Sequence, residues 1–320
     1  MRYLINVGLL TVCGTLCHAQ KEPQIFRASA FDIGKSQFLM PAVAPGQVIE
    51  FAVRLPASMV EALKLNFIRG ETPVEAAPWP LKLAEWSGKV RYRETGAEVR
   101  TWDMPVGGVR YVYFPGLGET ALVTVQFPWE ANRPPLGLDV GDYGASFSLS
   151  AAGQETAPVT ARVVGSAPLL SGLRREGGPE GPARPGDRLT ILATGLGRTS
   201  PPTPAGTAPR SPVPLEPFVF GGFNYGPRCC QVYFDFDNPS MPLGYGRVPV
   251  PAEEVTLKPG EVGVYEIRVT MPPVPGSVSS CTGWNPGSGS GSGNTRVTVV
   301  GDGRSDAPAQ MFFCTAPDPL

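Results

Sequence analysis

Apolar and polar residues alternate in several short segments of the chain, which is the pattern of strands with one buried face. Residues 121–127 carry apolar side chains at every second position, and residues 230–236 and 265–271 repeat the pattern. In a strand, such positions point to the same side of the sheet. Only residues 57–65 have the character of a short helix. The pattern therefore predicts an all-β fold.

The two halves of the chain contain similar segments in the same order. Residues 45–56 read PGQVIEFAVRLP and residues 185–197 read PGDRLTILATGLG. Later in each half, residues 121–130 read ALVTVQFPWE and residues 263–272 read GVYEIRVTMP. A pattern that occurs twice indicates a repeat of one β-rich unit. It favours a binding or structural array over a single catalytic core.

Composition supports two β-rich domains. The chain has 39 glycines and 37 prolines among 320 residues, but 42% of its residues are hydrophobic, enough for real cores. Short strands joined by Pro/Gly turns are typical of β-sandwiches, and a chain of this length exceeds one such core. We expect modules at residues 20–168 and 185–320. The Gly/Pro-rich residues 169–184 are expected to be a linker that permits relative motion of the modules.

The repeated segments resemble a family of secreted bacterial proteins with tandem immunoglobulin-like (IPT/TIG-like) repeats. Residues 185–197 resemble the opening of the repeat, and the Pro/Ala-rich residues 201–217 follow it. Residues 259–272 (PGEVGVYEIRVTMP) match its later strand, and residues 123–130 (VTVQFPWE) are the counterpart in the first half. The resemblance implies two tandem immunoglobulin-like β-sandwich modules and an extracellular setting. It implies no catalytic residues.

The amino-terminal segment has the features of a signal peptide, assigned to residues 1–19. Arg2 supplies a positive charge, residues 4–16 are largely apolar, and Ala19 is a small residue at the expected cleavage position. An uncleaved anchor is the alternative, although the apolar stretch is short for a membrane span. We expect the mature chain to be extracytoplasmic (periplasm, cell surface or extracellular) and without a membrane span.

Charge and histidine content exclude several functions. Removing residues 1–19 leaves 26 Lys plus Arg against 28 Asp plus Glu, because Arg2 is the one charged residue removed. A net charge of 26 − 28 = −2 gives no electrostatic case for nucleic-acid binding. The one histidine, His18, lies in the signal segment. The mature chain therefore lacks the residue for a Ser-His-Asp triad, a Cys-His pair or an imidazole zinc site. Nucleotide-binding motifs are also absent, and we expect no cofactor and no enzymatic activity.

Four cysteines remain after export, namely Cys229, Cys230, Cys281 and Cys314. An even number in an exported chain predicts disulfides. Adjacent Cα atoms lie about 3.8 Å apart across a trans peptide, which is short for a disulfide. We therefore expect Cys229 and Cys230 each to bond to a distant cysteine, and of the two possible pairings we favour Cys230 with Cys314 and Cys229 with Cys281. A zinc site made by the four thiolates is the alternative, but the paired C-x-x-C spacing is missing.

Acidic residues offer two further chemistries, neither with a specific motif. Calcium ligands are conceivable at Asp235, Asp237 and Asn238, or in the looser group Asp302, Asp306 and Asp318, yet neither set matches the twelve-residue calcium loop. Carboxylate pairs that might hydrolyse glycosides are Asp235 with Asp237 and Glu253 with Glu254. We interpret residues 235–237 as a solvated acidic strand face, and we expect no metal.

Aromatic side chains are the remaining candidates for ligand contact, because a flat ring can stack on a sugar. Trp284, in a Gly/Pro-rich loop, is expected to be exposed, and Tyr225 and Tyr245 are the other candidates. The chain is thus predicted to be a secreted, non-enzymatic binding, adhesion or scaffolding protein acting through loops and strand edges. The alternative is a carbohydrate-binding or weakly carboxylate-dependent glycan-active protein. Its expected partner is an extracellular protein or polysaccharide.

Overall fold

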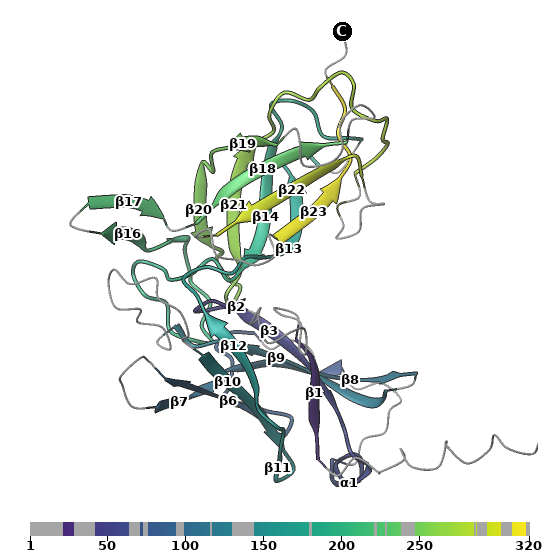
Figure 1. The fold of residues 1–320 in the computed structure, drawn as a ribbon, viewed down its shortest axis with the longest axis vertical. Coiled ribbons are helices and arrows are strands. Elements are labelled where there is room, and N and C mark those ends of the chain that lie inside the picture. Colours follow the sequence, from purple (N-terminus) through teal and green to yellow (C-terminus); the bar gives the residue numbers. More distant parts are fainter. Residues whose placement is uncertain are drawn as a thin grey trace, which may run out of the picture.

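Nearly all the regular structure is β-strand, as the alternation predicts (Figure 1). The computed structural model describes residues 22–28, 42–63, 71–72, 76–93, 99–115, 117–129, 144–178, 181–220, 223–227, 229–237, 247–284, 286, 293–301 and 309–317. Within these ranges the only helix is α1 (Ala57–Ala62). None of the described residues forms a helix long and apolar enough to cross a bilayer. The all-β prediction is confirmed.

Two sheets form the first half of the structure. One has the order β1 (Gln24–Ala28), β3 (Val48–Arg54), β9 (Gly118–Gln126), β8 (Val106–Phe114) and β4 (Glu71–Thr72). The other has the order β2 (Ala42–Val43), β12 (Val159–Val163), β10 (Gly144–Ala151), β6 (Trp86–Arg93) and β5 (Lys82–Leu83), with β11 (Gln154–Glu155) on β10 and β7 (Val99–Met104) on β6. All their pairings are antiparallel except that of β2 with β12. Their inward side chains share one core, in which Phe147 contacts Phe51 and Phe127 at ring distances of 5.8 and 5.7 Å.

The second half contains a five-stranded sheet, a four-stranded sheet and a hairpin. The five-stranded sheet has the order β13 (Leu169–Arg175), β14 (Arg188–Thr194), β21 (Tyr265–Thr270), β20 (Glu254–Leu257) and β15 (Val213–Pro214). The four-stranded sheet has the order β19 (Val248–Val250), β18 (Gln231–Phe236), β22 (Thr295–Val300) and β23 (Ala309–Phe313). The hairpin pairs β16 (Pro217–Phe220) with β17 (Phe223–Pro227). A second core includes Ile267, Phe234 and Phe313.

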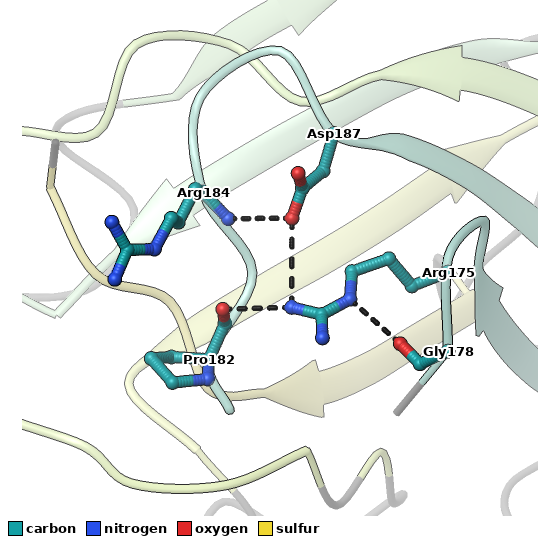
Figure 2. Close-up of polar contacts among 5 residues, drawn as sticks. All are labelled: Arg175, Gly178, Pro182, Arg184 and Asp187. Atoms are coloured by element: carbon teal, nitrogen blue, oxygen red, sulfur yellow. Dashed lines mark hydrogen bonds and ion pairs between the residues drawn. The ribbon is translucent and has the colours of Figure 1, made fainter. Parts of the chain in front are cut away.

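Part of the segment expected to be a linker is a strand. Residues 169–175 form β13, which pairs with β14. Figure 2 shows how Arg175 fastens the residues that follow: its guanidinium donates to the Gly178 and Pro182 carbonyls at 3.0 and 2.8 Å. It also lies 3.5 Å from the Asp187 carboxylate, which accepts a bond from the Arg184 amide. The Gly/Pro composition indicated a loose connection, whereas long-range pairing makes this segment part of the second half.

The disulfide pairing differs from the expected one. Cys229 is joined to Cys230 across a cis peptide bond, and Cys281 to Cys314. The predicted pairs are wrong because the argument assumed the spacing of a trans peptide, whereas these neighbouring Cα atoms lie 3.1 Å apart. Both residues also precede β18, so the alternation of a strand does not turn them apart. The four cysteines thus form two separate pairs in this structure, not the single four-thiolate cluster of the zinc alternative.

Candidate functional site

One buried glutamine, Gln126, links the halves of the molecule, and a second, Gln47, braces the first half next to it. Gln126, the last residue of β9, donates to the Gly46 carbonyl at 3.0 Å and accepts from the Gly206 amide at 2.5 Å. The Gly206 carbonyl in turn accepts from the Trp79 amide at 2.8 Å. Gln47 donates to the Ala167 carbonyl at 3.1 Å. The first half therefore holds the Gly206 loop by a chain of hydrogen bonds shielded from water.

Glycines allow the halves to approach this closely. Gly195 and Gly263 both have positive φ, +74° and +67°, which disfavours other residues. A Cβ on Gly263 would lie 2.6 Å from the Gly46 carbonyl oxygen, and one on Gly195 would lie 2.8 Å from Gln47 Cδ. At this contact the two halves cannot slide past each other without breaking the hydrogen bonds of Gln126. It argues against the relative motion that the linker composition suggested.

The contact between the two halves around Gln126 and Gly206 is called the junction below. The side chain of Trp129 extends there from the first half and packs against the second. It follows β9 and Pro128, is 4% exposed, and packs edge-to-face against Tyr265 at 6.3 Å. Its carbonyl accepts two long bonds from the Arg198 guanidinium, at 3.3 Å from Nη2 and 3.4 Å from Nε. Arg198 is itself held at its backbone, because its carbonyl accepts from the Glu216 amide at 2.8 Å.

Burial keeps the hydroxyl of Tyr265, beside this junction, protonated. Its hydroxyl donates to the Gly197 carbonyl in the loop that precedes Arg198. Burial raises the pKa of Tyr265 well above its ordinary value, because the phenolate would lose its hydration. The phenol therefore keeps its proton and continues to donate. This contact secures the loop from the core side.

A cavity of about 490 Å³ opens at this junction. Its walls combine apolar rings with groups that can form hydrogen bonds: Trp129, Arg198, Thr199, Pro202, Thr203, Pro204 and Glu216. Thr199 and Thr203 are buried, their hydroxyls lie 3.1 Å apart, and the Thr199 hydroxyl also accepts from the Thr203 amide. The volume falls within the range of small-molecule sites.

The side chains that line the cavity can both donate and accept hydrogen bonds. Arg198 supplies donors, the exposed Glu216 carboxylate supplies acceptors, and the prolines supply apolar surface. Guanidinium and carboxylate groups at one site suit a ligand that both accepts and donates hydrogen bonds. In the described part of the chain, no group of three His, Cys, Asp or Glu side chains is placed to hold a metal.

The predicted aromatic contacts lie elsewhere or outside the described residues. Trp284 is half-buried rather than freely exposed: it packs edge-to-face on Phe313 at 5.4 Å, and the Arg175 guanidinium lies 5.4 Å from its ring. It belongs to the second core and does not line the cavity. The backbone of Tyr225 lies in β17, and Tyr245 lies outside the described residues.

Asp235 of β18 does not lie on the solvated face that we expected, whereas Asp237, just after this strand, is half-buried. Asp235 is 1% exposed, and its Oδ2 accepts from Arg296 at 3.0 and 2.7 Å. Arg247 approaches its other oxygen at 3.5 Å. Cross-strand arginines cover this carboxylate, and they neutralise a group that a calcium site or a glycosidase would need free. Asn238, Asp302, Asp306 and Asp318 lie outside the described residues.

The second carboxylate pair is also engaged. Glu254 forms an ion pair with Arg268 at 2.7 Å, and Glu253 accepts a hydrogen bond from the Thr270 hydroxyl. Both contacts are exposed and tie neighbouring strands together. Neither side chain lines the junction cavity.

The cavity residues were missed in the sequence, where residues 201–217 looked like a proline-rich surface loop. Arg198 and Glu216 are 18 positions apart, and backbone bonds of the type Ser200 amide to Pro214 carbonyl bring them together. A carboxylate and a guanidinium flanking a proline-rich segment were the only signal. No spacing rule connects them.

Comparison with known proteins does not identify a function for this chain. No family model and no curated protein matches the chain. A surface glycan-binding protein from Prevotella bryantii is 11% identical, with a TM-score of 0.22 over 91% of this chain and 42% of its own. A Salmonella alpha-2-macroglobulin variant is 9% identical, with a TM-score of 0.16 over 87% of this chain and 16% of its own. The chain thus spans less than half of either protein, and scores of this size do not establish a shared fold.

Proposed function

We propose that this protein is an extracytoplasmic, non-catalytic binding protein built of two immunoglobulin-like modules, and that the junction cavity holds a small polar ligand. The observation that carries the proposal is the convergence of Arg198, Thr199, Thr203 and Glu216 on one cavity of about 490 Å³. Disulfides and the signal-like leader support export.

The residues around the cavity are held in place by hydrogen bonds, and such rigidity favours ligand binding. Loops held on a rigid scaffold lose little conformational freedom when they bind. Here the cavity wall is fixed by the Glu216 amide, the Thr199–Thr203 contact and the Tyr265 hydroxyl. A ligand would meet its hydrogen-bonding partners already in place, and no group in the cavity is paired as a nucleophile with a base.

The proposal is tested by ligand-observed NMR with a panel of neutral mono- and oligosaccharides, free amino acids and dipeptides. Glu216→Gln keeps the backbone bond to Arg198 and removes the carboxylate, so binding should weaken about tenfold or more, the loss expected for hydrogen bonds to a charged group. Glu61→Gln, an exposed glutamate on α1, is the matched control and should bind as the parent does.

Two results would count against the proposal. One is that no compound of the panel binds at millimolar concentration. The other is that Glu216→Gln and Glu61→Gln bind equally well, which would place any binding away from the cavity. Equal melting temperatures for the two variants exclude unfolding as the cause of a difference.

A further inference from the structure

One face of the β12–β10–β6 sheet carries only hydroxyl and cationic side chains on these three strands. The other face is the core, where Val90, Phe147 and Ala161 are fully buried. Strand alternation turns the intervening residues outward. Those with a described exposure are Ser87, Lys89 and Arg91 on β6, Ser146, Ser148 and Ser150 on β10, and Thr160 and Arg162 on β12.

The register sets short side chains between longer ones on this face. Strand β10 lies between β6 and β12 (Figure 1). Ser146 is opposite both Arg91 and Thr160, and Ser148 is opposite Lys89. The Ser87 and Ser150 hydroxyls lie 2.9 Å apart, which places both on the same face. Strands are about 4.8 Å apart and alternate residues about 7 Å apart. Short serines therefore form a floor, with longer side chains about 10 Å apart on its two sides.

Two exposed cationic side chains lie along one side of this sheet face. Lys89 and Arg91 are exposed, and no described carboxylate forms an ion pair with either. The half-buried Arg162 stands on the far side of β10. Among the described residues, the acidic neighbours are Asp103, opposite Lys89 on β7, and Glu155, opposite Ser150 on β11. Arg91 therefore lies farther from both of these carboxylates than Lys89 does.

We infer that this face binds a linear anionic polysaccharide, with its carboxylate or sulfate groups on Lys89 and Arg91 and its hydroxyls on the serines. Guanidinium and ammonium groups suit such anions, and serine can both donate to and accept from a sugar hydroxyl. Nucleic acid is disfavoured because these outward positions carry no aromatic ring for base stacking. This surface is separate from the junction cavity, so either site can fail without the other.

The test measures binding of the full chain to polygalacturonate by biolayer interferometry, with uncharged dextran as the neutral polymer. Lys89→Ser with Arg91→Ser replaces both cations by the residue that already lines the floor. The double variant should bind about five- to twentyfold more weakly, the change expected for two exposed ion pairs. The matched control, Arg54→Ser with Arg174→Ser, removes two exposed cations elsewhere and should change binding less than about twofold.

Salt and competing polymers decide the remaining alternatives. Binding by the parent chain should weaken when ionic strength rises from about 0.05 to 0.2 M, because exposed charges are screened. The inference is overturned if polygalacturonate does not bind at the lower salt, or if the two double variants bind alike. It is equally overturned if polyglutamate or single-stranded DNA competes as well as the polysaccharide, since the site would then select charge alone. Unchanged circular dichroism in both variants shows that they fold.

Discussion

Replacing Gln126 by alanine tests whether the two halves form one cooperative unit. The side chain is fully buried and bonds to Gly46 on one side and Gly206 on the other. Its removal leaves a buried carbonyl and a buried amide without their partner, and each such group costs about 1–3 kcal/mol. Allowing for relaxation and for water entering the gap, we expect a loss of about 2–4 kcal/mol in the free energy of unfolding.

The assay is urea denaturation followed by tryptophan fluorescence, with hydrogen exchange as the local probe. Trp79 and Trp129 both lie at the junction, so the fluorescence signal reports on it. Exchange should rise at the Gly206 and Trp79 amides, whose bonds depend on the same loop. Gln24→Ala, an exposed glutamine on β1, is the control and should change stability by less than about 0.5 kcal/mol. A loss for Gln126→Ala no larger than that of the control would refute the reasoning.

Two further substitutions probe buried polar groups in the second half. Asp235→Asn keeps the shape but removes the charge that faces Arg296 and Arg247, and it should cost about 3 kcal/mol in chemical denaturation; an unchanged midpoint would show that the buried pair adds nothing. Tyr265 has a raised pKa in the folded state, so its contribution to stability is complete below pH 10 and is lost as the pH rises further toward its folded-state pKa. Melting curves between pH 9 and 11.5 should therefore fall less steeply for Tyr265→Phe than for the parent, and parallel curves would contradict this.

The strands with clean alternation were predictable from local pattern alone. The segments 121–127, 230–236 and 265–271 each lie on a strand (β9, β18 and β21) except for one residue at one end, because period-two spacing follows from the geometry of a single strand. The outcome for Asp235 shows the limit of the same rule. Alternation placed it on the face opposite Phe234, but whether that face meets water depended on arginines from β22 and from residue 247.

Two kinds of pairing were not predictable: pairing between strands far apart in the sequence, and the bond between two adjacent cysteines. The segment 169–175 reads as a loose connection, yet β14 pairs with it along its length. The disulfide pairing failed because it rested on a backbone geometry that the Cys229–Cys230 segment does not adopt. In both cases composition describes a residue's own preference, and partners elsewhere in the chain or an uncommon local geometry override it.

From its sequence alone this protein was determined to be all-β, with an even number of cysteines and its one histidine at position 18, because these properties depend on local periodicity or on counting. The tertiary structure decided that Arg198 meets Glu216 around a cavity and that Gln126 faces the neighbouring half instead of solvent. It also decided that Lys89, Arg91 and Arg162 share one sheet face. The physical reason is that such groups are joined only by long-range backbone pairing, which brings together residues that no periodicity relates.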